Sequence, residues 1–519
     1  MVHPSFPAPG SPAEATVFSA LQRRLTDLYH TVFADPMKPR TVLIVPSLSM
    51  DGDTLAKITG VHHYEERMLC MLMLLRLPRT KIIYVSSQAI APTVIDYFLN
   101  LLHGVPFHHA RGRLRLLNCY DASPTPLAQK ILQRPRLLQR IRDEIGDPGT
   151  AHLSCFNATE LERTLAVQLG IPIYGCDPDL LHFGSKSGGR DCFKEAGILM
   201  ARGHENLRDA QDIFEALADL RRNQPGLRKA VVKLNEGFSG EGNALFRYQD
   251  CPENAPAAWF RDTVPQRLQC EAKNEHWDSF AAKFQRMGGI VEAWIEGEEK
   301  CSPSVQCRIN PLGEVEVVST HDQVLGGPGG QIFLGCTFPA GDAYRQSIQE
   351  AGAKVGAVLA ERGVIGRFAL DFITVKQGDT WCNYAIEINL RKGGTTHPFM
   401  MLEYLADGAF DAASGLYRTQ AGQPRYYYAT DNLESDGYIG LSPEDLIDIS
   451  VCRDLHFHGV RQEGVVFHLI GALSEFGKLG AVCIGSSPQE ARSLYERTKK
   501  ILAEETQPVT EPNHEKAPV

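Results

Sequence analysis

One stretch of the chain, YAIEINLRK at residues 384–392, decides the fold class. Its apolar and polar side chains alternate, which is the pattern of a β-strand. Successive side chains of a strand point to opposite faces, so Glu387 and Asn389 share one face while Ile386 and Ile388 pack behind. The sequence therefore predicts a strand that presents two oxygen-bearing side chains on one side of an otherwise apolar sheet.

A second strand is predicted at residues 366–372, GRFALDF, which carries Asp371. A turn near Gln377-Gly378-Asp379 separates it from the first strand. Strands joined by so short a turn pair as an antiparallel hairpin. We therefore expect Asp371 to lie beside Glu387 and Asn389.

These three side chains predict a metal site. Two carboxylates and an amide crowded on one sheet face repel each other unless a cation lies between them. Oxygen ligands of this kind suit Mg²⁺, which fills its remaining shell with phosphate oxygens and water, and Mn²⁺ is the alternative ion. Arg391 is expected on the same face, where it can meet a phosphoryl or acyl-phosphate charge. The other interpretation is a solvated sheet face with ordinary ion pairs.

A short apolar strand upstream, residues 230–234, contains Lys233 near its end and is followed by the glycine-rich loop GFSGEG at 237–242. Glycines allow the backbone N–H groups to approach phosphate oxygens closely, and the lysine adds a cation to the same anion. The loop is not a Walker A motif, because the G-K-[ST] ending is missing. Taken alone, the pattern is more typical of a hairpin turn with a surface lysine.

The segment VEAWIEGEE at residues 291–299 is an apolar strand that ends in acidic side chains. Such a strand can line an adenine slot and offer carboxylates to ribose hydroxyls. Viewed alone, it is more typical of a solvated acidic turn.

The pattern along the chain predicts a mixed α/β (α+β) protein of several domains. Strands and helices alternate first; examples are a strand from Thr41, a helix over Tyr64–Leu77 and a basic helical stretch over Pro126–Ile145. The domains expected are an N-terminal extension at 1–39, a parallel-sheet α/β domain at 40–180, a central domain at 181–420, a compact C-terminal domain at 421–505 and a disordered tail at 506–519.

Composition narrows the class of protein further. The net charge of -9 argues against a sequence-independent nucleic-acid binder, which needs a basic face. The 13 cysteines are scattered without a C-x-x-C pair, as expected for reduced thiols in a cytoplasmic protein. The N-terminus has no signal-peptide pattern, and the most apolar stretch, Met68–Leu75, is too short to span a membrane.

Taken in order, these segments resemble the ATP-grasp superfamily. A lysine in GSKSGGR at 184–190, Lys186, looks like the first ATP-binding lysine of that fold. More narrowly, the chain is similar to the pheganomycin-type peptide ligases over about residues 40–500. The motifs that carry this similarity are PSLS at 46–49, YEER at 64–67, GSKSGGR, QIFLGC at 331–336, EINLRKGGTTHP at 387–398 and VVFHLIGALSEFGKLG at 465–480.

The resemblance implies an ATP-grasp fold between a pre-ATP-grasp domain and a small C-terminal domain. It also implies a role for each motif residue. Those expected to contact the ATP phosphates are Lys186, Lys233 and the loop positions Gly237, Ser239, Gly240 and Gly242. Those expected around adenine and ribose are Glu292, Ile295 and Glu299. The implied magnesium ligands are Asp371, Glu387 and Asn389, and the implied catalytic residues are Arg391 and Lys233.

The activity implied is ATP-dependent ligation of a carboxylate substrate to an amine or peptide acceptor through an acyl phosphate, with release of ADP and phosphate. The alternatives are an ATP-grasp protein with another phosphoryl acceptor, or a module that senses ATP without turnover. His397 could assist substrate binding or proton transfer, although a histidine before a proline is more often structural. No nucleic-acid or membrane partner is expected, and a homodimer is left open.

Overall fold

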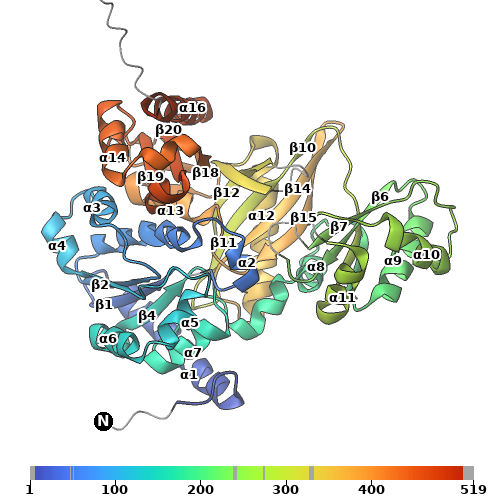
Figure 1. Cartoon of the computed structure of the whole chain (residues 1–519), viewed down its shortest axis with the longest axis horizontal. Helices are drawn as coiled ribbons and strands as arrows, with labels where there is room; N and C mark the ends of the chain where they lie inside the picture. The colour runs from blue at the N-terminus through green and yellow to red at the C-terminus, as the bar shows by residue number, and fades with distance from the viewer. Residues whose placement is uncertain are drawn as a thin grey trace, which may run out of the picture.

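The computed structural model describes residues 6–46, 48–50, 52–237, 242–272, 275–326 and 332–506. Three β-sheets organise them: a four-stranded, a five-stranded and an eleven-stranded sheet. Figure 1 shows the four-stranded sheet and its helices at the lower left, the five-stranded sheet at the right, and the long strands β14 and β15 between them. The predicted mixed α/β class is confirmed.

The N-terminal sheet is entirely parallel, with strand order β3-β2-β1-β4. Its central strand β1 is buried along its whole length, as expected for a sheet covered by helices on both faces. The strands are β1 (Arg40–Val45), β2 (Thr80–Ser86), β3 (Leu114–Asn118) and β4 (Ala151–Cys155). The helices of this region are α1 (Pro12–Leu28), α2 (Gly52–Ala56), α3 (Pro92–Asn100), α4 (Phe107–Gly112), α5 (Leu127–Leu132), α6 (Pro135–Ile145) and α7 (Glu160–Leu169), with the π-helix η1 (Tyr29–Phe33) and the 3₁₀ helix η2 (Val61–Arg76).

Two of the predicted helices differ from the structure. The helix expected over Tyr64–Leu77 is the 3₁₀ helix η2, and both helix types repeat their buried positions every three or four residues, so periodicity does not separate them. The helix expected over Pro126–Ile145 is divided into α5 and α6. Pro135 causes the division, because the residue before a proline is driven away from helical backbone angles, and Arg134 has φ -121° and ψ 82°.

The five-stranded sheet is antiparallel, with strand order β5-β9-β6-β7-β8. Phenylalanines from its strands and helices form a separate core, in which Phe246, Phe260, Phe280 and Phe284 are fully buried. Its strands are β5 (Gly203–Leu207), β6 (Lys229–Leu234), β7 (Asn243–Arg247), β8 (Gln269–Cys270) and β9 (Gly289–Ala293), and its helices are α9 (Ala210–Asn223), α10 (Ala257–Arg267) and α11 (Trp277–Met287).

The eleven-stranded sheet runs from β10 to β16 in the order β10-β14-β11-β12-β13-β18-β17-β16, with β15 added to β14 and β20 joining β18 to β19. Its strands are β10 (Lys300–Cys301), β11 (Pro303–Ile309), β12 (Val315–Gly326), β13 (Ile332–Phe338), β14 (Gly366–Gln377), β15 (Thr380–Asn389), β16 (Gly408–Asp411), β17 (Leu416–Thr419), β18 (Pro424–Glu434), β19 (Gly464–His468) and β20 (Lys478–Gly485). The helices associated with this sheet are α8 (Lys186–Glu195), α12 (Asp342–Glu361), α13 (Thr396–Leu405), α14 (Pro443–Cys452), α15 (Leu473–Phe476) and α16 (Pro488–Glu505). Four short 3₁₀ helices lie elsewhere in the described chain: η3 (Pro148–Thr150), η4 (Pro178–Gly184), η5 (Asp436–Gly440) and η6 (Ile470–Ala472).

The domain boundaries inferred from the sequence remain predictions. The one near residue 421 falls between β17 and β18, which pair in the same sheet. The tail expected at 506–519 lies outside the described residues except for Thr506. Within the described part of the chain, no helix combines the length and apolar character needed to cross a bilayer.

The pairing of β5 with β9 leaves no room for a side chain at Gly203. A Cβ atom there would lie 2.4 Å from the Val291 carbonyl oxygen and 2.8 Å from the Glu292 Cα. We therefore expect Gly203→Ala to destabilise the five-stranded sheet by ~1–3 kcal/mol, as overpacking does. Urea unfolding followed by circular dichroism measures the change. Gly226→Ala is the matched control, since nothing lies within 4 Å of its Cβ position; equal midpoints for the two variants would contradict this packing.

Candidate active site

The predicted hairpin is present and centres on Asp371. Strands β14 and β15 pair antiparallel, with Asp371 opposite Glu387 and Ala369 opposite Asn389. The Asn389 Nδ2 donates a hydrogen bond of 2.9 Å to the Asp371 Oδ2. The turn contains Gly378, whose φ of 61° is left-handed and favours glycine. The hairpin therefore brings the three predicted metal ligands together.

Neighbouring strands complete the surroundings of Asp371. Strand β11 places Ser304 opposite Asp371, and Gln323 of β12 donates its Nε2 hydrogen to the Asp371 Oδ1 at 3.1 Å. A register shift between Asp371 and Phe372 marks a β-bulge in the hairpin. Bulges of this kind re-aim side chains and occur often beside active sites.

Burial and charge act differently on the two carboxylates. Burial, reinforced by the nearby Glu387, raises the pKa of Asp371 to about 6, although a hydrogen bond from Ser304 and the charge of Lys186 oppose this. Burial also acts to raise the pKa of Glu387, but the Lys186 ammonium outweighs it and holds that pKa below its ordinary value. The Lys186 Nζ lies 2.6 Å from the Glu387 Oε2, and the charges of Arg391 and Lys233 act in the same direction. The cations converge on the acidic face.

Lys233 belongs to a buried ion cluster that ties helix α8 to the five-stranded sheet. Its Nζ lies 2.5 Å from one Glu292 carboxylate oxygen, and the Arg190 Nη1 lies 3.2 Å from the other. All three side chains are less than a tenth exposed. The backbone N–H of Lys186 donates to the Asn235 carbonyl at 3.1 Å, so the two lysines are held on adjoining backbone segments.

The two ends of the glycine-rich loop lie together. The Leu234 N–H donates to the Gly242 carbonyl at 2.9 Å, and a Cβ atom on Gly237 would lie only 3.2 Å from the Gly242 Cα. Ser239 and Gly240, also predicted to contact phosphates, lie outside the described residues.

The residues predicted to surround adenine and ribose each make other contacts in the structure. The Glu292 side chain is engaged by Lys233 and Arg190, as described above. The Ile295 carbonyl accepts a hydrogen bond from the Lys300 Nζ at 3.4 Å. Glu299 is exposed and pairs with Lys376 at 2.9 Å, so the structure brings it to an edge of β14 and does not pair it with Lys186 or Lys233.

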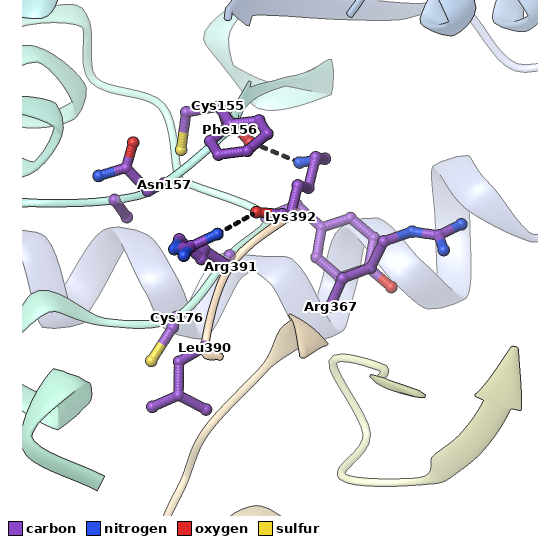
Figure 2. Close-up of a pocket in the computed structure, with 11 residues that line it drawn as sticks. Cys155, Phe156, Asn157, Cys176, Arg367, Leu390, Arg391 and Lys392 are labelled. Atoms are coloured by element: carbon purple, nitrogen blue, oxygen red, sulfur yellow. Dashed lines mark hydrogen bonds between the residues drawn. The ribbon is translucent and has the colours of Figure 1, made fainter. Parts of the chain in front are cut away.

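Arg391 lies just beyond the end of β15, in a small pocket shared with the first domain (Figure 2). Its Nη1 donates to the Lys392 carbonyl at 3.1 Å, and its guanidinium lies 6.0 Å from the Phe156 ring centre. The Lys392 Nζ donates to the Cys155 carbonyl at 2.5 Å, and Arg367 lines the same pocket. Burial lowers the pKa of Arg391, while the carboxylates Glu387 and Asp371 oppose that effect. The pocket therefore joins three cationic side chains to an aromatic ring.

Some residues of the site were not predicted. Arg190 was quoted within GSKSGGR but given no role, although it follows Lys186 by four residues and so shares its helix face. Ser304 lies on β11, which pairs with β14, and Gln323 lies on β12, which pairs with β11; neither pairing leaves a local signal in the sequence. Only long-range pairing brings them to Asp371.

The buried cluster around Glu292 predicts a large stability effect. Glu292→Gln leaves Lys233 buried without its anion, while Arg190 keeps its second partner, Glu205, and breaking a buried ion pair in this way costs ~3–5 kcal/mol. Glu296→Gln, which breaks the exposed pair with Arg228, is the matched control and should change stability by less than ~1 kcal/mol. Chemical denaturation of both variants measures the difference, and equal losses would contradict the proposed importance of burial.

Comparisons with known proteins show which protein families and relatives the chain is similar to. A family model described as IQCH-like, ATP-grasp matches residues 179–257 and 263–413, and the PGM1 C-terminal domain model matches 445–498. The chain is 29% identical over 469 residues to an L-propargylglycine–L-glutamate ligase of Streptantibioticus cattleyicolor, covering 89% of this chain and 94% of that protein. It is 24% identical over 379 residues to the IQ motif-containing protein H of Danio rerio, covering 64% of this chain and 36% of that protein.

Solved structures share the fold at lower identity. A biotin carboxylase of Campylobacter jejuni matches with a TM-score of 0.53 and 13% identity, covering 91% of this chain and 96% of its own. An N5-carboxyaminoimidazole ribonucleotide synthetase in complex with ADP matches with a TM-score of 0.50 and 14% identity, covering 91% and 98%. The lysines, the acidic hairpin and these similarities agree with the family inferred from the motifs. Residues 179–257 and 263–413 match an ATP-grasp family model, and the chain resembles the ATP-grasp ligases of the pheganomycin type.

Proposed function

We propose that the chain joins a carboxylic acid to an amine with ATP, through an acyl phosphate, and releases ADP and phosphate. The observation that carries the proposal is the register of the β14–β15 hairpin, which sets Asp371 against Glu387 with Asn389 beside them. Lys186 contacts this acidic group directly, and the charge of Lys233 acts on Glu387. Acids and cations that face one another in this way suit a triphosphate and its divalent ion.

The donor set fits Mg²⁺, with Mn²⁺ as the alternative, because two carboxylates and an amide are oxygen ligands held close together. Asp371, Glu387 and Asn389 are the residues proposed to hold the ion. When bound, the ion neutralises charge on the phosphate oxygens. Lys186 and Lys233 are proposed to contact the phosphates, with the 237–242 loop over them.

The adenine and ribose assignments for Glu292, Ile295 and Glu299 remain proposals. Glu292 forms ion pairs with Lys233 and Arg190. Its proposed role in the nucleotide site therefore includes holding Lys233 in position.

The proposed chemistry has two steps. A carboxylate oxygen of the first substrate attacks the γ-phosphorus of ATP, and ADP leaves with the bonding electron pair. The amine nitrogen of the second substrate then attacks the acyl carbon, inorganic phosphate leaves, and the nitrogen loses a proton to give the amide. Arg391 is proposed to face the transferred phosphoryl group, where a fixed guanidinium needs no rearrangement as negative charge develops.

We propose amino acids as the substrate class. Over 89% of its length the chain is similar to a ligase whose name gives two amino acids as substrates. The small pocket in Figure 2 is lined by Arg367, Arg391, Lys392 and Phe156, and its cations are proposed to lie near the substrate carboxylate. The cytoplasmic location and a homodimer remain predictions.

An ADP-release assay tests the reaction. The purified chain is given Mg²⁺ and ATP with pairs of amino acids, short peptides and small acids, and products are identified by mass spectrometry. The expected result is ADP release that requires both an acid and an amine, with a product lighter than their sum by one water. ADP release that does not depend on the amine would support another phosphoryl acceptor. ATP binding without ADP release would support an ATP sensor.

Glu387→Ala should abolish ligation while preserving the fold, because it removes a proposed ion ligand and leaves the apolar packing of the hairpin unchanged. The expected loss in turnover is at least ~100-fold, the scale of one preorganised electrostatic contact. Asp379→Ala, in the exposed turn of the same hairpin, is the matched control and should retain activity. Circular dichroism checks folding; activity in folded Glu387→Ala would overturn the assignment.

Metal binding at the site should weaken in acid. The pKa of Asp371 is raised to about 6 by burial and by Glu387, and only the ionised carboxylate binds a divalent ion. Between pH 7.5 and pH 5 the ionised share falls to about a tenth, so the affinity for Mn²⁺ should fall ~10-fold. Electron paramagnetic resonance of Mn²⁺ without nucleotide measures this. Asp371→Asn should bind weakly at every pH, and a flat profile in the unaltered protein would contradict the prediction.

A further inference from the structure

A second cluster of ligand-type side chains lies in the C-terminal part of the chain. His397 begins helix α13, Asp431 lies on β18, and His468 ends β19, so three elements distant in sequence contribute one side chain each. All three are buried, with exposed fractions of 4%, 6% and 2%. None of them is among the residues proposed to hold the ATP-linked ion.

Three atoms of the cluster converge on one point. The His397 Nε2 and His468 Nε2 lie 3.0 Å apart. The Asp431 Oδ1 lies 3.1 Å from the first nitrogen and 2.7 Å from the second. Ligand atoms that share one tetrahedral Zn²⁺ at ~2.0–2.1 Å are themselves separated by roughly 3 Å. The triangle therefore has the size of one face of a zinc coordination shell.

Hydrogen bonds satisfy this triangle only in part. A neutral imidazole carries one N–H, on either Nδ1 or Nε2. If both protons are on Nδ1, two nitrogen lone pairs and a carboxylate face each other. If both are on Nε2, each can reach Asp431, but the two N–H groups then face each other at 3.0 Å. In the mixed case a single N–H serves two acceptors, and a nitrogen lone pair still faces the carboxylate. A cation at the centre accepts all three lone pairs at once.

The two nitrogens of each histidine ring differ in their surroundings. The Nδ1 atoms of His397 and His468 are buried and have no hydrogen-bond partner within the described residues. The Nε2 atoms are therefore the ring nitrogens that face other polar side chains in this cluster.

The surrounding residues hold the cluster in place. A Cβ atom on Gly480 would lie 2.2 Å from the His468 Nε2, so only glycine leaves space for that ring. The Arg67 Nη1 lies 3.2 Å from the Asp431 Oδ2, which fixes the carboxylate with its other oxygen toward the histidines. A charged group that orients a ligating carboxylate in this way is a common outer-shell partner of a metal ligand.

We propose that His397, Asp431 and His468 bind one divalent transition-metal ion, with Zn²⁺ as the matching chemistry. Two imidazole nitrogens and one carboxylate oxygen suit this class of ion better than Mg²⁺, which prefers an all-oxygen shell. The ion links α13 to β18 and β19. Through Asp431 and Arg67, whose guanidinium lies 4.8 Å from the Phe156 ring centre, it also supports the wall of the Arg391 pocket.

Metal analysis of the full chain, purified without a histidine tag, tests the site. After dialysis against Zn²⁺ and then buffer, we expect about one zinc ion per chain by mass spectrometry of the elements, falling roughly tenfold or more in His397→Gln and His468→Gln. The described residues hold two other groups of histidine and acidic side chains, His62/His63/Glu475 and Asp454/His456/His458, both less buried. His63→Gln and His458→Gln are therefore the matched controls and should retain the zinc.

Spectroscopy of the unaltered chain tests the site even when the histidine variants fail to fold. Chelated wild-type chain loaded with Co²⁺ should show the visible bands of a low-coordinate ion, and X-ray absorption should show two imidazole ligands. Zinc-free wild-type protein after loading, zinc lost equally in His458→Gln, or a cobalt spectrum without imidazole ligation would each overturn the proposal.

Discussion

The structure depends on the placement of two like charges side by side on a partly buried sheet face. Asp371 and Glu387 are direct partners in the β14–β15 register, and Asp371 is also paired with β11 on its other side. Carboxylates in such a setting are costly unless cations accompany them. The pKa of Asp371 is raised and the pKa of Glu387 is lowered, because the nearby cations act more strongly on Glu387.

The positive charge near this hairpin comes from lysines in other parts of the chain. Lys186 begins helix α8, and Lys233 lies on the five-stranded sheet, which has its own aromatic core. Glu292 keeps Lys233 and Arg190 in place, so the five-stranded sheet is electrostatically connected to the acidic hairpin. The proposed nucleotide site therefore draws on two sheets with separate apolar cores, which are linked through charged side chains.

The hairpin could be predicted from the sequence because its signals are local. Alternation in residues 384–390 and a glycine turn at 378 are enough to specify which side chains meet. Other features depend on pairing between distant segments. Glu292 was interpreted as an adenine-slot residue, whereas the structure pairs it with two cations whose strand and helix the pattern of 291–299 does not indicate. The same holds for His397, whose partners Asp431 and His468 come from strands added to the sheet much later in the chain.

If the chain binds a divalent ion and ATP as proposed, the contact between Lys186 and Glu387 couples the two binding events. An ammonium 2.6 Å from a carboxylate oxygen occupies the position that an incoming divalent ion needs. An ion at this oxygen competes with the lysine for the same negative charge, and an ammonium released from it would be free to meet a phosphate. Each ligand thus removes a competitor of the other, and by thermodynamic linkage the two must bind with positive cooperativity.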